Sequence, residues 1–235
     1  MRWLFLIVPV TVWAQTTEMV GQLGSRPVLL VLHASKAEDG AWQLAGEYIV
    51  LTTLQRRFLE GEASPAIGVT TLREGTTPIL FGRTPTGELR GTLRGGIFKG
   101  ARYAPGGRER ERFEFSEDFA SLENYSGTVR CESSDARYAY SVNFAVQGGK
   151  VQALEWRSKL AASGHICQVA NLPQEPWQGG LRLASGRCTV TVRDLGDYLR
   201  LAAENCHEFC GSQAYLEPVL IDRRGSCRLL RPEAR

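Results

Sequence analysis

The segment Leu89-Arg90-Gly91-Thr92-Leu93-Arg94-Gly95-Gly96-Ile97-Phe98-Lys99-Gly100 begins and ends with one short pattern: a large apolar residue, any residue, then glycine. The pattern also occurs at Leu44-Ala45-Gly46, Leu59-Glu60-Gly61 and Leu80-Phe81-Gly82, and the last three glycines of the series are nine residues apart. Nine residues is about one strand plus one turn. Glycine lets a sheet bend sharply or lets neighbouring backbones approach. The pattern therefore predicts an antiparallel meander that curls towards a barrel.

The segment that follows the last of these glycines is rich in charge. The segment Arg108–Phe115 ends with two apolar residues at a spacing of two, Phe113 and Phe115. This spacing predicts a strand with both phenylalanines inward. The outward side then carries Arg108, Arg110, Arg112 and Glu114. These arginines could form an anion-binding stripe, but we favour a solvated edge strand that charge protects from aggregation.

The second half of the chain also has the period of strands. Tyr138, Tyr140, Val142, Phe144 and Val146 alternate on one face, and Gly148-Gly149 turns the chain into the segment 151–156, which predicts a hairpin. Further strands are expected at 165–169, 181–183 and 188–192. The fold class is thus predicted to be all-β and mainly antiparallel, with two meander or barrel-like domains and little helix.

Residues 198–210 fit two structures. A strand would place Leu199 and Leu201 inward, whereas a helix would begin at Asp197 and end at Gly211. We favour a strand followed by a tight loop from Cys206 to Cys210.

The cysteines and the start of the chain bear on location. Residues 1–14 combine Arg2, a short apolar stretch and a small residue at Ala14, which is typical of a signal peptide with Gln15 as the first mature residue. The alternative is a buried first strand. All six cysteines lie between residues 131 and 227. We therefore expect a periplasmic or secreted protein with a signal peptide (1–14), a cysteine-free β domain (15–118), a linker (119–124) and a disulfide-stapled β domain (125–235).

An even number of cysteines in an exported chain favours disulfides over a metal site. The six are Cys131, Cys167, Cys188, Cys206, Cys210 and Cys227. The Cys206-His207-Glu208-Phe209-Cys210 spacing fits neither a zinc knuckle nor a thioredoxin-type redox pair. Six cysteines allow fifteen pairings. Our working hypothesis pairs Cys131 with Cys167 and connects Cys206 and Cys210 to two different strands.

Composition and motifs argue against several classes of function. The net charge is only +3, with both signs interspersed, which gives no indication of a nucleic-acid partner. No segment after the signal is apolar enough to cross a membrane. The sequence has no Gly-x-Ser-x-Gly elbow and no phosphate or dinucleotide loop, so we expect neither a cofactor nor a metal, and no enzyme activity.

The candidate binding residues lie in two loops. Trp177, between Pro176 and Gly179, is either a binding contact or a lid over the core. His207, Glu208 and Phe209 lie between two cysteines, in a loop that disulfides would hold in place. Carboxylate pairs such as Glu60 with Glu62 could serve glycoside hydrolysis, but 25 acidic residues produce such pairs by chance.

Two segments resemble known exported proteins. Gly21-x-x-Gly24, Gly46-Glu47-Tyr48, Leu72-x-Glu74 and Gly106-Gly107 make residues 21–117 similar to a module of uncharacterised exported bacterial proteins. Cys188-x-Val190-x-Val192 and Cys206-x-x-x-Cys210-Gly211 resemble disulfide-bonded periplasmic β-domains, of which the lysozyme inhibitors are the best known. The resemblance implies a protein that protects the bacterial envelope by plugging a lysozyme cleft.

We therefore expect an exported, non-enzymatic protein that binds a protein or a cell-envelope component. The alternatives are a cell-wall hydrolase that uses carboxylates and a purely structural envelope protein.

Overall fold

The computed structural model describes residues 15–36, 42–64, 68–77, 84–134, 136–211, 216–223 and 227–229. The predicted signal peptide (1–14) and the Leu80-Phe81-Gly82 repeat lie outside these residues. The all-β prediction is confirmed, since every described sheet is antiparallel and the described helix has four residues. The chain divides into two compact units, residues 1–118 and 119–235.

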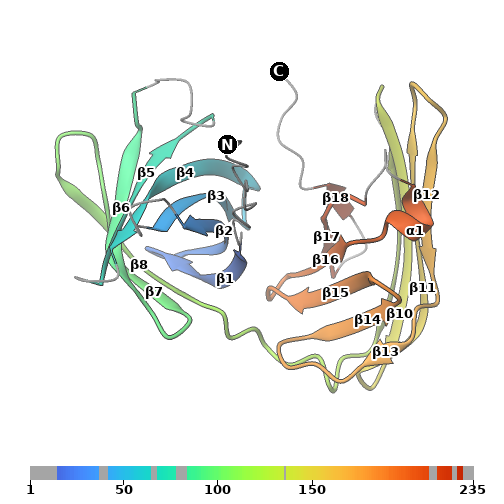
Figure 1. Cartoon of the computed structure of the whole chain (residues 1–235). Coiled ribbons are helices and arrows are strands. Elements are labelled where there is room, and N and C mark those ends of the chain that lie inside the picture. Colours follow the sequence, from blue (N-terminus) through green and yellow to red (C-terminus); the bar gives the residue numbers. More distant parts are fainter. Residues whose placement is uncertain are drawn as a thin grey trace, which may run out of the picture. The chain divides into compact units, whose positions relative to one another are not determined.

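The first unit is a closed eight-stranded barrel, which confirms the meander predicted from the glycine repeat (Figure 1). Each strand pairs with the next in the chain, and β1 closes the ring by pairing with β8 between Val20↔Ser116 and Leu23↔Phe113. The strands are β1 (Gln15–Leu23), β2 (Arg26–Lys36), β3 (Trp42–Val50), β4 (Gln55–Ser64), β5 (Val69–Gly75), β6 (Gly87–Arg94), β7 (Ile97–Tyr103) and β8 (Glu109–Ser116).

The glycines of the repeat lie where the backbones of neighbouring strands come closest. A Cβ atom added to Gly46, Gly61, Gly91 or Gly100 would lie 1.9–2.2 Å from a carbonyl oxygen of the adjacent strand. No real side chain tolerates such a distance, so only glycine allows these strands to coil tightly enough to close the ring. The prediction that glycine permits close approach is confirmed at these four positions.

Side chains fill the interior of the barrel. Phe113 packs 4.7 Å from Phe98 and 5.1 Å from Phe115 between ring centroids. An eight-stranded barrel has an interior just wide enough for side chains to fill it. The first unit is thus built around a packed apolar core.

The prediction that the charged segment Arg108–Phe115 forms an edge strand is wrong. The structure pairs β8 with β7 on one side and with β1 on the other. The inward positions of Phe113 and Phe115 are confirmed, because they are 4% and 0% exposed. Period two showed which residues point inward, but ring closure requires a partner that lies about ninety residues earlier.

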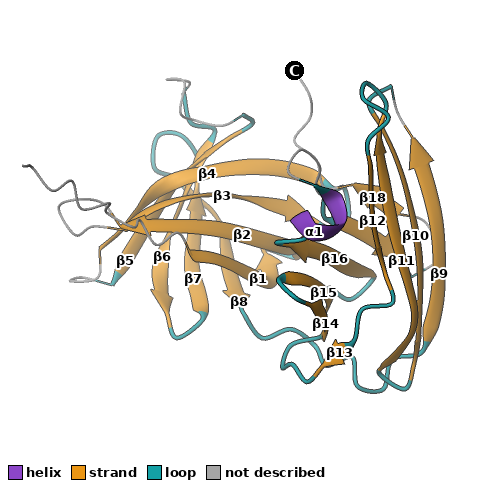
Figure 2. Cartoon of the chain, turned by 45° about the vertical axis from the view of Figure 1, so that its right-hand side comes forward, coloured by secondary structure: helices purple, strands orange, loops and turns teal. Residues whose placement is uncertain are grey.

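The second unit consists of two sheets that share one hydrophobic core (Figure 2). The four-stranded sheet has the order β12-β11-β10-β9 and the six-stranded sheet the order β13-β14-β15-β16-β17-β18. Neither sheet closes on itself in the part of the chain that the structure describes. The strands are β9 (Gly127–Ser134), β10 (Tyr138–Gln147), β11 (Lys150–Leu160), β12 (Ile166–Ala170), β13 (Gln174–Glu175), β14 (Leu181–Ser185), β15 (Cys188–Asp194), β16 (Tyr198–Glu204), β17 (Val219–Asp222) and β18 (Cys227–Leu229).

Local predictions in this unit have three outcomes. The hairpin is confirmed as β10 and β11, joined through Gly148-Gly149. Residues 198–204 form a strand as favoured, but the loop predicted after it contains one helical turn, α1 (His207–Cys210), because Phe209 N and Cys210 N both donate to Cys206 O. The segment predicted to be a linker packs on this unit, since Leu122 is 1% exposed within its core.

Candidate functional site

A buried ionic network closes one end of the barrel. The Glu74 carboxylate is fully buried and accepts hydrogen bonds from Arg102 Nε (2.7 Å) and Arg102 Nη2 (2.8 Å). It also accepts from the Tyr48 hydroxyl (2.8 Å) and the Thr86 hydroxyl (3.1 Å). Four bonds on two oxygens meet the needs of a buried carboxylate, so the network is stable in one arrangement.

The pKa values follow from this arrangement. Burial opposes ionisation of Glu74, but the hydrogen bonds and the charge of Arg102 outweigh it and hold the pKa of the carboxyl below its usual range. Burial, together with the charge of Glu74, raises the pKa of Tyr48 well above that of a free phenol. Glu74 is therefore ionised and Tyr48 neutral at neutral pH. Neither group is poised to exchange a proton with a substrate.

The network continues along the same rim of the barrel. Arg57 Nε lies 3.8 Å from Glu74, and Arg102 Nη1 lies 3.9 Å from Glu111. Glu111 in turn accepts a hydrogen bond from Arg26 Nη2 at 2.6 Å. Together with the Tyr48 hydroxyl, these contacts join side chains of β2, β3, β4, β5, β7 and β8. The geometry is that of a structural clamp on the barrel mouth.

A groove on the outer wall of the barrel, over β6, β7 and β8 and the end of β1, is the best candidate for a binding surface. It has a volume of about 650 Å³, and we call it the barrel-wall groove. Its floor is formed by Gly100 and Ala101, which have no long side chain. The side chains around the floor are Gln22, Arg90, Thr92, Lys99, Tyr103, Glu109, Arg112 and Glu114.

Strand register explains how this groove is built. Ala101 pairs with Arg90 on β6 and with Arg112 on β8, so two arginines flank one methyl group. The neighbouring row places Lys99 between Thr92 and Glu114. Because side chains alternate between the two faces of a strand, both rows point away from the apolar core.

The Arg90 side chain is held in place from two sides. Its guanidinium lies 4.9 Å from the centroid of the Tyr103 ring and donates to both carboxylate oxygens of Glu88. A second hollow, of about 270 Å³ between the β5–β6 and β7–β8 connections, is also lined by Arg90 and Glu88. Arg90 thus separates two hollows on one surface.

The backbone positions of the two groove carboxylates lie farther apart than the carboxyl pair of a glycosidase. Glu109 and Glu114 are five residues apart on β8, which corresponds to roughly 15 Å of extended chain. Glycosidases place their two carboxyl groups roughly 5–9.5 Å apart. The other pair, Glu60 and Glu62, lies on β4, where Glu60 contacts Arg73 at 3.8 Å and Glu62 accepts from Gln43 at 3.0 Å.

The sequence-predicted site residues lie in two places. Trp177 is half-buried, and the Arg193 guanidinium lies 4.9 Å from its ring centroid and 4.1 Å from that of Phe119. His207 and Glu208 are exposed on α1, whereas Phe209 is half-buried against the core of the unit. The structure keeps these three together because they share one helical turn. Trp177 belongs to the β13–β14 connection instead.

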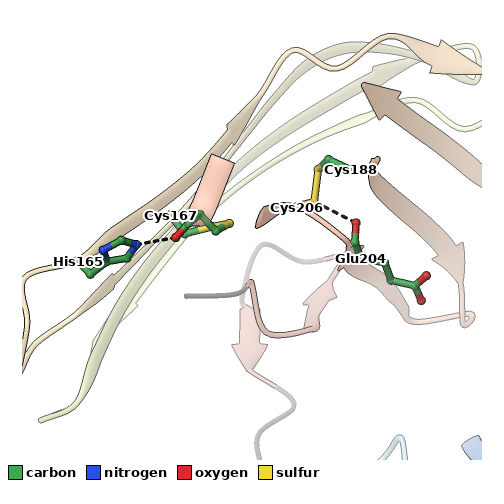
Figure 3. Close-up of a disulfide and its surroundings, with 6 residues drawn as sticks. His165, Cys167, Cys188, Glu204 and Cys206 are labelled. Atoms are coloured by element: carbon green, nitrogen blue, oxygen red, sulfur yellow. Dashed lines mark hydrogen bonds between the residues drawn. A yellow bond between two sulfur atoms is a disulfide. The ribbon is translucent and has the colours of Figure 1, made fainter. Parts of the chain in front are cut away.

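The helical turn that carries His207 and Glu208 is anchored at its end. The His165 ring, through Nε2, is 2.6 Å from the carbonyl oxygen of Cys210, and Cys206 Sγ lies 3.3 Å from the carbonyl oxygen of Glu204 (Figure 3). With Cys206 and Cys210 both in disulfides, the turn is fixed at both ends.

The disulfides are Cys131–Cys227, Cys167–Cys210 and Cys188–Cys206. Cys206 and Cys210 reach different strands, as predicted, but the pairing of Cys131 with Cys167 is wrong. Cys131 is on β9 and Cys167 on β12, at opposite edges of the four-stranded sheet. Three strand spacings separate them by about 14 Å, whereas a disulfide needs Cα atoms within about 7 Å.

Comparisons with known proteins leave the site to be interpreted from its own chemistry. No protein-family model, no curated protein and no solved structure matches this chain. Within the described part of the chain, no helix is long and apolar enough to cross a membrane. No group of three or more potential metal ligands occurs there either.

Proposed function

We propose that this chain is an exported, non-enzymatic protein that protects the bacterial cell envelope by binding. Its three disulfides support the exported location, because such bonds persist in oxidising compartments. Lysozyme is the first enzyme to test the protection against, since the second half of the chain resembles the periplasmic lysozyme inhibitors.

The barrel-wall groove carries the binding part of the proposal. It combines a concave shape with fixed polar groups, which is the usual composition of a recognition surface. Arg90 is already held by Glu88 and Tyr103, so less conformational freedom is lost when a ligand docks on it. By contrast, the buried carboxylate of Glu74 has all its partners within the protein and supports the fold.

The test is a cell-wall clearing assay with lysozyme and an excess of the purified mature protein. We expect clearing to slow in proportion to the protein added. The Arg90→Ala variant removes the central side chain of the groove and should protect less. Arg94→Ala, an exposed arginine on the same strand but outside the groove, is the matched control. Undiminished clearing at excess wild-type protein would eliminate the proposal.

A further inference from the structure

We propose that the barrel-wall groove binds a neutral oligosaccharide chain. This inference rests on the proposed binding function and names the chemical class of its ligand. The shape of the groove, the order of its polar groups and the balance of its charges support it.

The shape fits a chain of several sugar units. The floor is low because the short side chain of Ala101 lies between the two arginines. The barrel-wall groove, at about 650 Å³, and the adjoining hollow, at about 270 Å³, share Arg90. A ligand that crosses Arg90 would contact both, which favours an oligomer over a single sugar ring.

The order of polar groups fits hydroxyl groups. Along the strands, a row with Glu109 and Tyr103 is followed by the row of Arg90 and Arg112, and then by a row with Lys99, Glu114 and Gln22. Carboxylates accept hydrogen bonds, guanidinium groups donate them, and an amide does both. A sugar hydroxyl is both a donor and an acceptor, so neighbouring hydroxyls can use adjacent rows.

The balance of charges favours a neutral ligand over an anionic one. Three cationic side chains line the groove, but two carboxylates lie among them and Glu88 hydrogen-bonds to Arg90. Arg112 Nε also lies 3.6 Å from Glu109. A polyanion would meet these carboxylates at close range, which opposes its binding. An uncharged chain meets no such repulsion.

An aromatic ring completes the surface. Tyr103 is half-buried, and the Arg90 guanidinium lies over its ring. The ring and the guanidinium together present a flat, rigid area with apolar and polar parts. The C–H face of a sugar ring packs on such an area while its hydroxyls reach the flanking side chains.

The test uses the full mature protein and the trimer of N-acetylglucosamine as the probe, with binding followed by calorimetry and by amide NMR shifts. We expect saturable binding with shifts at Gly100, Ala101 and Tyr103. Arg90→Ala and Tyr103→Ala should each weaken binding by about tenfold or more. Arg94→Ala should leave it unchanged. Circular dichroism checks that each variant is folded, and the wild-type NMR shifts test the site if a variant is not.

Several results would overturn the inference. These are no saturable binding of the trimer, shifts that lie elsewhere on the protein, or equal binding by wild type and Arg90→Ala. Dextran sulfate is the anionic competitor, and tighter binding of dextran sulfate than of the trimer would show that the groove selects charge. Slower wall clearing without trimer binding would leave the proposed function standing and the inference wrong. Trimer binding with undiminished clearing would support the oligosaccharide site and eliminate the protective function.

Discussion

The two units have the same fold class but stabilise their sheets in opposite ways. In the barrel every strand hydrogen-bonds to two neighbours, so the ring has no free edge. The barrel strands also contain no cysteine. In the second unit the four-stranded sheet ends at β9 and β12, and each of these edge strands carries a cysteine bonded out of the sheet, Cys131 to β18 and Cys167 to α1. Backbone closure and covalent bonds thus serve the same purpose, since open edges are a liability in β proteins.

Chemical reduction of the disulfides should reveal the difference between the two units most strongly. Removing the three disulfides should unfold the second unit and leave the barrel folded. In the loop-entropy model, the 96-residue separation of Cys131–Cys227 contributes about 4.7 kcal/mol and the 18-residue separation of Cys188–Cys206 about 3 kcal/mol. Hydrogen exchange with and without reductant measures this directly. Loss of amide protection in β1–β8 at the same time as in β9–β18 would contradict the comparison.

The converse change is Glu74→Gln in the barrel. It leaves the half-buried Arg102 without its carboxylate, and breaking an ion pair with a buried partner costs about 3–5 kcal/mol. We expect β1–β8 to lose protection in less urea while β9–β18 stay unchanged. Glu60→Gln is the matched control. The ion pair of Glu60 is long, at 3.8 Å, and its partner Arg73 is exposed, so it should contribute less than about 1 kcal/mol. Equal effects of the two substitutions would show that the network adds no stability.

Barrel closure can be tested at Gly100. A methyl group in Gly100→Ala would lie 2.0 Å from Arg90 O and 2.6 Å from Gly91 Cα, so β6 and β7 must move apart. We expect a loss of about 3 kcal/mol, measured by urea unfolding. Gly95→Ala is the control, since it meets nothing within 4 Å and bears only the strain of φ +58°, about 1–2 kcal/mol. A smaller loss at Gly100 than at Gly95 would refute this account of the glycine repeat.

Acid and base should weaken the barrel through the same network. The lowered pKa of Glu74 means that its stabilisation is present above the ordinary carboxyl pKa and is lost as pH falls through the folded value. The raised pKa of Tyr48 means that its stabilisation is present below about pH 10 and is lost at higher pH. Urea midpoints of β1–β8 across pH should be flat in between and fall at both ends. In Glu74→Gln the acid slope should become shallower, and an unchanged slope would assign it to other carboxyls.

The sequence could predict those features of the fold that depend on local alternation of side chains. Alternation placed Phe113 and Phe115 inward, and the same alternation puts Glu74 on the inner side of β5 with Thr70 and Leu72, so its burial was a signal that could have been used. Three features could not be predicted from the sequence, for one common reason: the pairing of β1 with β8, the disulfide connectivity and the barrel-wall groove. Each depends on residues that are distant in the chain and adjacent only after folding.

The smallest expected effect concerns Trp177. Removing its ring in Trp177→Ala takes away one face of the stack on Arg193, which is worth about 1 kcal/mol. We expect a small decrease in the urea midpoint of β9–β18 and no change in wall protection. Lost wall protection in a variant of unchanged stability would instead make Trp177 a binding contact.

The order of the strands along the chain has a consequence for biogenesis. The barrel ladder is complete at residue 116, and the first cysteine is residue 131. A chain that emerges with its N-terminus first can therefore finish one folded unit before any thiol reaches an oxidising enzyme. Wrong sulfur bridges can form only among the last hundred or so residues, so disulfide isomerases have a small set of errors to correct.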